Sequence, residues 1–255
     1  MAGVAQAGLT DIDRALVERA RARTGAGAVG DLCYDMTSIA SPTGEELSLA
    51  EYLADRLVRV GARTRISRLG ESGASFVARI GRAQPDGVRL WIYAPLDTAF
   101  SGNVNEDEPW LGNSPRADFA LPASREGGKI IGMGAENPKG FASAGIAAFE
   151  AIALEHPDLR GEIVLTLAGG SMPVGARPGL GSGIGHGAGM KQLIAEEPRA
   201  DFAIVLKPGY AVSHEEVGYA WFRVTVRGAV NYTGIRHKGP YRNPVVAAAR
   251  VVNHL

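Results

Sequence analysis

The chain alternates between strand and helix patterns along its length, and this alternation is the feature that most restricts its fold. Short runs rich in β-branched and apolar residues predict strands at residues 63–67, 75–80, 88–93, 163–167 and 202–206. The run at 88–93 is nearly all apolar, as expected for a strand that is covered on both faces of a sheet. The order predicts an α/β domain with a central mixed, largely parallel sheet flanked by helices, rather than a helical bundle or a sandwich.

Capping signals mark where helices begin. Thr10 is placed to cap the first helix, and the pair Thr43 and Glu46 predicts a capping box ahead of a leucine periodicity that ends before Gly61. A run of small residues at 138–154 predicts a helix that packs closely on the sheet, with proline in its tolerated first turn.

Composition excludes several classes of partner. Lysine plus arginine equals aspartate plus glutamate at 27 each in 255 residues, so no net field favours nucleic acid or an anionic membrane. The single cysteine, Cys33, excludes an internal disulfide and fits a reducing compartment. Neither a signal peptide nor a run of about 18 apolar residues is recognisable, so we expect a cytoplasmic protein.

Four segments carry a family resemblance. They are SPTGEE (41–46), IYAPLDTAF (92–100), GGKIIGMGAENPKG (127–140) and DFAIVLKPG (201–209). In order and approximate spacing they resemble the M20 family of metallopeptidases and deacylases. The resemblance implies a zinc-peptidase-like core, with residues 1–215 as an incomplete catalytic-type domain and residues 216–255 as the start of a lid or dimerisation domain.

The family's metal ligands are replaced at the matching positions. The resemblance places the family's first metal-binding histidine at Pro95, while the aspartate that orients it is retained as Asp97. Asn137 stands where the family has the aspartate that bridges two metal ions, and an amide lacks the charge for that role. Lys207 replaces the acidic ligand before a proline, and its ammonium would repel a cation. We therefore expect no metal and no other cofactor.

The family's catalytic glutamates are also missing. No acidic residue occurs between Glu162 and Lys191, where the family has one glutamate as general base and a second as metal ligand. The lid histidine that polarises the scissile carbonyl aligns best with Tyr232, with Asn231 beside it. A tyrosine hydroxyl can still donate a hydrogen bond to an oxyanion.

Two classes of function fit these replacements. In the first, the chain is a metal-independent hydrolase of an amide or related C–N bond in a small polar substrate. Lys207 would supply the positive charge, Asp97 would orient it, and Asn137 would bind the substrate. The remaining candidates are Tyr232 for the oxyanion, with Glu136, Asn231 and His186 as substrate contacts. In the second class, the chain is a non-catalytic subunit that binds a ligand or stabilises an active partner.

Structural explanations exist for the same residues. Asp97 and Lys207 could form an ion pair without catalytic purpose, and Asn137 could cap the following helix. Cys33 lies in an apolar helical pattern and is expected to be packed rather than reactive. The glycine-rich stretch at 179–189 matches no phosphate-binding motif and is expected to be a flexible loop near the cleft.

The C-terminal part predicts an incomplete lid. A strand is expected at residues 220–228 and a helix at residues 243–255. One strand and one helix cannot bury their apolar faces by themselves. We therefore expect a second polypeptide that supplies the rest of the lid and of the catalytic domain, in a hetero- or homo-oligomer.

Overall fold

The computed structural model describes residues 8, 10–111, 116–155, 159–172, 185–209, 211–215, 224–229, 232–238 and 242–254. These residues fall into two units, Met1–Gly209 and Tyr210–Leu255. Each unit is treated by itself. No helix in the described part of the chain is long and apolar enough to cross a membrane.

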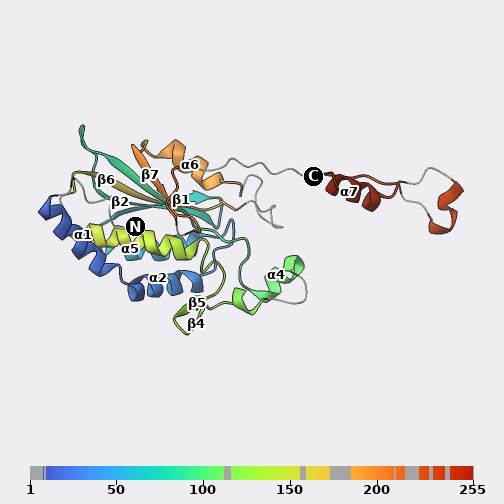
Figure 1. Cartoon of the computed structure of the whole chain (residues 1–255), viewed down its shortest axis with the longest axis horizontal. Helices are drawn as coiled ribbons and strands as arrows, with labels where there is room; N and C mark the ends of the chain where they lie inside the picture. Colours follow the sequence, from blue (N-terminus) through green and yellow to red (C-terminus); the bar gives the residue numbers. More distant parts are fainter. Residues whose placement is uncertain are drawn as a thin grey trace. The chain divides into compact units, whose positions relative to one another are not determined.

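The first unit is built on a five-stranded mixed sheet in the order β1-β2-β6-β3-β7 (Figure 1). The strands are β1 (Arg63–Leu69), β2 (Gly73–Arg82), β3 (Arg89–Pro95), β6 (Gly161–Ala168) and β7 (Phe202–Val205). The strands β6, β3 and β7 run parallel, whereas β1 and β2 are antiparallel to their neighbours. A separate hairpin pairs β4 (Ser124–Glu126) with β5 (Lys129–Ile131). The predicted fold class is confirmed.

Helices cover the two faces of the sheet unequally. The helices of the first unit are α1 (Asp11–Arg23), α2 (Ala26–Ser38), α3 (Leu47–Val58), α4 (Val104–Leu111), α5 (Lys139–Glu155) and α6 (Ala188–Glu196), with a short 3₁₀ turn η1 (Ala117–Phe119). Helices α3 and α5 pack on one face, α2 packs on α5, and α6 packs on the opposite face against β2 and β6. Figure 1 shows α6 on the far side of the sheet from α2 and α5.

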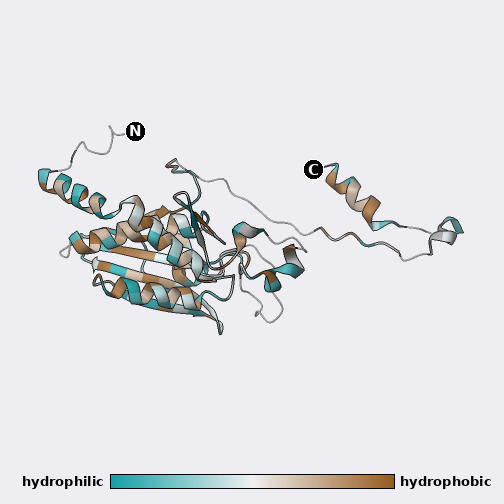
Figure 2. Cartoon of the chain, turned by 90° about the horizontal axis from the view of Figure 1, so that it is seen from below, coloured by the Kyte–Doolittle hydropathy of each residue, from teal (hydrophilic) through white to brown (hydrophobic). Residues whose placement is uncertain are grey.

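Alternation along the strands divides the core into two layers. Ile92 and Leu165 face the layer under α3 and α5, whereas Trp91 and Val164 face α6 and its buried Leu193. The strands of the sheet are accordingly hydrophobic over much of their length (Figure 2). Trp91 and Cys33 are both buried, as their sequence patterns predicted.

Helix starts agree with the sequence in one case and differ in another. Thr10 caps α1 in a capping box with Asp13, with 3.2 Å from the Asp13 backbone nitrogen to the Thr10 hydroxyl. The capping box predicted for Thr43 and Glu46 is wrong, because α3 begins after Glu46 with no side-chain cap. Both side chains are buried and bind elsewhere, as described below.

The second unit contains a 3₁₀ turn, η2 (Thr233–Lys238), and α7 (Pro244–Val252). The predicted helix is confirmed, and Asn243 caps it by accepting a hydrogen bond from the Val245 backbone nitrogen at 2.9 Å. The strand predicted at 220–228 is wrong for its described part, since residues 224–229 have no strand structure. Val224 in this segment is 62% exposed. An apolar alternation forms a strand only where a neighbouring strand is available for hydrogen bonding.

Candidate functional site

The candidate site lies at the edge of the sheet where the three parallel strands end. β3 ends at Pro95, β6 at Ala168 and β7 at Val205, so the segments that follow them leave the sheet at the same edge. In open α/β sheets this edge is where ligands bind. Of the predicted site residues, Asp97, His186 and Lys207 lie on these segments, and Glu136 and Asn137 lie between β5 and α5.

The loop after β6 presents four consecutive backbone N–H groups to buried side chains. Gly169 donates to the Ser75 hydroxyl at 3.1 Å, and Gly170 donates to Glu46 at 2.9 Å. The next two N–H groups both donate to Asp97, from Ser171 at 3.0 and 2.9 Å and from Met172 at 2.9 Å. Acidic side chains from two other segments, Glu46 and Asp97, therefore hold the backbone of residues 170–172.

Glu46 is a buried carboxylate, and its only predicted role was in the helix capping box with Thr43. Besides Gly170, it accepts hydrogen bonds from the backbone nitrogens of Gly44 at 2.8 Å and Ala74 at 3.0 Å. Burial raises the pKa of Glu46, the backbone donors oppose that rise, and nearby Asp97 adds to it. Glu46 therefore ties the start of α3, the strand β2 and the loop after β6 together.

Asp97 is fully buried and anchors the same loop from β3. In addition to the two backbone donors, it accepts a hydrogen bond from the Thr43 hydroxyl at 2.8 Å. Burial raises the pKa of Asp97, and the hydrogen bonds from Met172, Thr43 and Ser171 oppose that rise. The contacts from Ser171 and Met172 hold the loop backbone in place, and the contact from Thr43 connects that loop to the segment before α3.

The glycines of this region allow close backbone approach. A Cβ atom on Gly169 would lie 2.2 Å from the Ala74 carbonyl oxygen, and one on Gly189 would lie 2.2 Å from the Gly169 carbonyl oxygen. Of the glycine-rich stretch at 179–189, residues 179–184 lie outside the described part. The described remainder leads into α6, and the Gly187 and Ala188 nitrogens donate to the Gly170 carbonyl oxygen in the loop after β6.

A cavity of about 640 Å³ opens beside this loop. Its lining residues are Thr98, Ala99, Phe100, Arg116, Asp118, Phe119, Ile130, Ile131, Gly132, Met133, Gly134, Ala135, Glu136, Asn137 and Met172. Asn137 and Glu136, both predicted as site residues, are therefore on its wall. Asp97 lies behind the wall, bonded to Met172 and adjacent in sequence to Thr98.

The other predicted site residues are not among the residues that line this cavity. Lys207 is exposed and follows β7, and the bond from the Leu206 nitrogen to the Tyr93 carbonyl oxygen at 2.8 Å keeps its backbone beside β3. His186 is exposed, and its backbone nitrogen donates to the carbonyl oxygen of Met172, a cavity residue, at 3.0 Å. Tyr232 is 75% exposed in the second unit, and Asn231 lies outside the described residues.

Part of the cavity wall is aromatic, and its residues were not among the predicted site residues. The rings of Phe100 and Phe119 are stacked with centroids 6.4 Å apart and planes 23° apart. The Arg116 guanidinium lies 4.6 Å from the centre of the Phe119 ring and bonds to Asp118 at 2.9 Å. Phe100 ends the motif at 92–100, but Arg116 and Phe119 lie in no motif, and the two loops meet only in the folded chain.

Lys139, the first residue of α5, is buried beneath the cavity wall. Its amine donates to the Ile39 carbonyl oxygen at 2.7 Å, and its stem packs under Gly134. Burial lowers the pKa of Lys139 to about 7, with a small opposing effect from Cys33. Burial also raises the pKa of the Cys33 thiol, in keeping with a packed cysteine.

The residues at this edge do not fit a two-metal centre. No group of three or more His, Cys, Asp or Glu side chains among the described residues is arranged to hold a metal ion. At the matching positions, Pro95 offers no ligand atom and Lys207 carries a positive charge. The one retained acid, Asp97, is buried and bonded to Thr43 and to the loop backbone.

Comparisons with known proteins agree with this fold. No protein-family profile matches the chain. It is 23% identical over 234 residues to a succinyl-diaminopimelate desuccinylase of Rickettsia canadensis and 25% identical over 228 residues to that of Rickettsia rickettsii. Both matches cover 87% of this chain and 55% of the relative, so the chain spans about half the length of these curated proteins.

Two solved structures share the architecture. Human carnosine dipeptidase 1 superposes with a TM-score of 0.52 at 18% identity, over 75% of this chain and 40% of that one. Legionella LapA superposes with a TM-score of 0.51 at 12% identity, over 77% of this chain and 47% of that one. The fold is thus that of α/β peptidases. The desuccinylase matches and the four sequence motifs support a relationship to the M20 family of metallopeptidases and deacylases, at 23–25% sequence identity.

Proposed function

We propose that this chain hydrolyses an amide or related C–N bond in a small substrate without the two-metal centre of its relatives. The observation that carries the proposal is the cavity at the carboxyl edge of the sheet, which keeps Asn137 and Glu136 on its wall. Asp97 and Glu46, the buried acids near the cavity, accept hydrogen bonds from backbone N–H groups and are proposed not to bind a metal.

Each polar residue has a separate task in this proposal. The Asn137 side chain binds the substrate amide or carboxylate, and Glu136 and His186 contact polar groups at the rim. Lys207 supplies the positive charge that polarises the carbonyl. Asp97 acts through the loop backbone, since its contacts are with Thr43, Ser171 and Met172.

The relatives suggest the substrate class. The curated matches are named for removal of a succinyl group from an amine, and a carnosine dipeptidase shares the fold. An N-acylated amino acid contains the same kind of bond and fits a cavity of about 640 Å³. We therefore assign this class to the cavity.

A second polypeptide is part of the proposal. The four residues of β7 are exposed, including Phe202 at 65%, Ile204 at 49% and Val205 at 47%. Apolar side chains point to both faces of β7. Such a pattern is typical of a strand in the interior of a sheet, whereas an edge strand usually carries charged or polar residues. In the second unit, α7 exposes Val245 by 73% and Val252 by 69%. A partner that adds a strand to β7 and covers α7 would bury these surfaces.

The test combines metal analysis with an assay. The purified protein is dialysed against a chelator, analysed for metal and incubated with N-succinyl and N-acetyl amino acids, and released amine is quantified. Turnover that survives removal of metal supports the proposal. Turnover that appears only after zinc is added contradicts metal independence, and ligand binding without turnover in any preparation favours a non-catalytic subunit.

A further inference from the structure

Two acidic side chains are found among the described residues that line the cavity, Glu136 and Asp118. Asp118 accepts two hydrogen bonds from the Arg116 guanidinium, at 2.9 and 2.5 Å, and this pairing lowers the pKa of its carboxyl group. A lower pKa makes a carboxylate a weaker base, so Asp118 is poorly suited to take a proton from water. Glu136 has no side-chain partner in the described part of the chain, so its carboxylate is available.

The turn that carries Glu136 is held in place by its neighbours. The Lys139 backbone nitrogen donates to the Gly134 carbonyl oxygen at 2.9 Å, and Lys139 itself is 1% exposed. Gly134 has a φ of +80°, and a Cβ atom there would lie 2.7 Å from the Thr98 side chain. Because the turn packs this closely, Glu136 is presented to the cavity from a fixed backbone, as a reacting group requires.

The other titratable groups near the cavity are buried or lie outside its lining. Asp97 and Glu46 are buried and accept hydrogen bonds from backbone N–H groups. The Lys139 amine is buried and donates to the Ile39 carbonyl oxygen at 2.7 Å. His186 is exposed and does not line the cavity. Glu136 is therefore the carboxylate best placed to reach a water molecule inside the cavity.

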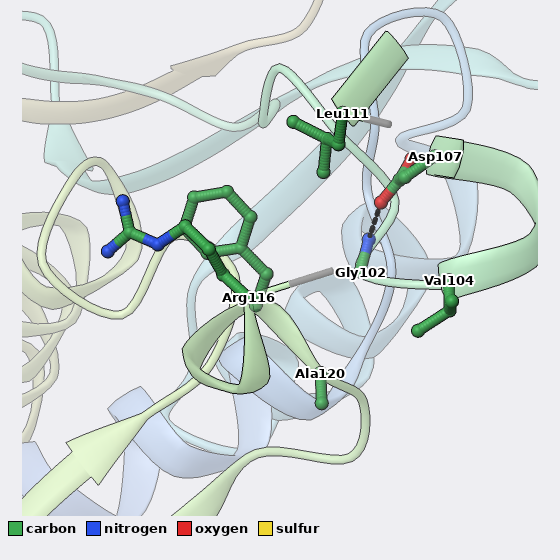
Figure 3. Close-up of a pocket in the computed structure, with 7 residues that line it drawn as sticks. Gly102, Val104, Asp107, Leu111, Arg116 and Ala120 are labelled. Atoms are coloured by element: carbon green, nitrogen blue, oxygen red, sulfur yellow. Dashed lines mark hydrogen bonds between the residues drawn. The ribbon is translucent and has the colours of Figure 1, made fainter. Parts of the chain in front are cut away.

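A second hollow shares Arg116 and Phe119 with the cavity but is too small for a substrate. Its volume is about 10 Å³, which is about the space of one water molecule. Figure 3 shows the hydrogen bond between Asp107 and the Gly102 nitrogen in its wall, which measures 2.8 Å. A substrate near Arg116 consequently occupies the larger cavity, on whose wall Glu136 lies.

We propose that Glu136 is the general base of the hydrolysis and takes the role of the glutamate that is missing after β6. This inference rests on the proposed amide-hydrolase function. Asn137, to which that proposal assigns the substrate amide, is the next residue in the chain and lines the same cavity. An amide bound by Asn137 thus lies beside the Glu136 carboxylate.

The proton passes through Glu136 in two steps. The carboxylate takes a proton from water while the water oxygen bonds to the amide carbonyl carbon and the carbonyl π electrons move to the carbonyl oxygen. Glu136 then gives this proton to the amide nitrogen as the C–N bond breaks and the carbonyl re-forms. The products are a carboxylic acid and an amine, and Glu136 returns to its starting state. General-base catalysis of this kind contributes about 10²–10⁴-fold to a rate.

The variant E136Q separates proton transfer from binding, since glutamine has similar size and polarity but takes no proton from water. The probes are N-succinyl-L-alanine and N-acetyl-L-alanine, with chelator-treated protein. We expect kcat to fall by at least about 100-fold and the affinity measured by calorimetry to change by less than about threefold. E126Q, at an exposed glutamate of β4, is the matched control, and thermal unfolding checks that both variants are folded.

Chemical rescue distinguishes a base from a residue that only contacts the substrate. Formate supplies a carboxylate in the space that E136A vacates, so it should raise the rate of E136A by at least about tenfold. Formate should have no such effect on the parent or on E136Q, where that space is filled. A loss in E136A that formate does not restore, combined with weaker binding of both probes, would overturn the inference.

The two proposals fail separately. If the parent hydrolyses the probes and E136Q does so at the same rate, the hydrolase proposal stands and the assignment of Glu136 falls. A large loss of kcat in D118N with parent-like E136Q would likewise overturn the assignment, because the base would then be Asp118. A parent with no turnover in any preparation would overturn both proposals.

Discussion

The backbone N–H of Ser171 donates to both carboxylate oxygens of Asp97, at 3.0 and 2.9 Å. In M20 relatives the matching aspartate is expected to orient a metal-binding histidine, whereas here the histidine position is Pro95 and the aspartate holds a loop. These hydrogen bonds give Asp97 a structural role in holding the loop after β6. The same loop supplies Met172 to the cavity wall, so Asp97 connects the core to the candidate site.

Replacement of Asp97 by alanine should destabilise the protein strongly. The change leaves the N–H groups of Ser171 and Met172 without their acceptor and removes the shorter hydrogen bond of the Thr43 hydroxyl, at about 1–3 kcal/mol for each group that stays buried and unpaired. We expect a loss of about 2–5 kcal/mol in the free energy of unfolding, measured by denaturant titration. D31N, at an exposed residue, is the control, and a loss no larger than that of the control would contradict the assigned role.

Stability should depend on pH through Lys139. Its pKa is lowered from 10.5 to about 7 in the folded protein, so the unfolded chain binds the extra proton between these values. The free energy of unfolding should therefore rise as pH increases from about 7 to 10.5, with a slope of up to about 1.4 kcal/mol per pH unit from this group. Denaturant titrations at several pH values measure the slope.

The variant K139M should remove this slope. Methionine fills similar space without a titratable amine, so the variant should gain stability relative to the parent at pH 6 and little at pH 10. K129M alters an exposed lysine of β5 and serves as the matched control. An unchanged slope in K139M would show that the amine is not the responsible group.

Removal of the Lys207 charge should abolish activity without loss of stability. K207M is expected to reduce kcat by at least about 100-fold if Lys207 polarises the carbonyl. Because Lys207 is exposed, the free energy of unfolding should change by less than about 0.5 kcal/mol. K191M, at an exposed lysine of α6, is the control for general charge loss. Parent-like turnover in K207M would remove Lys207 from the catalytic proposal.

A charge on β7 should prevent assembly with the second polypeptide. F202D places a carboxylate on the exposed apolar strand, and loss of a phenylalanine that the partner would bury should weaken binding by at least about tenfold. Native mass spectrometry of the protein purified without denaturant compares the parent, F202D and the control V58D, which alters an exposed residue at the end of α3. A parent that is monomeric at all concentrations would contradict the need for a partner.

The sequence by itself determined the class of fold. Alternating patterns identified the five strands of the sheet, because burial on one or both faces leaves a regular trace in a single segment. The motif positions also located Asn137 and Glu136, which the structure places on the cavity wall.

Only the tertiary structure decided what the remaining polar residues do. Glu46 follows a threonine at capping-box spacing, yet it binds Ala74 and Gly170, which lie 28 and 124 residues away. The pairing of Phe100 with Phe119 likewise depends on two loops meeting. Local patterns report local hydrogen bonding and burial, whereas the partner of a buried carboxylate or an aromatic ring is set by which distant segments the sheet brings together.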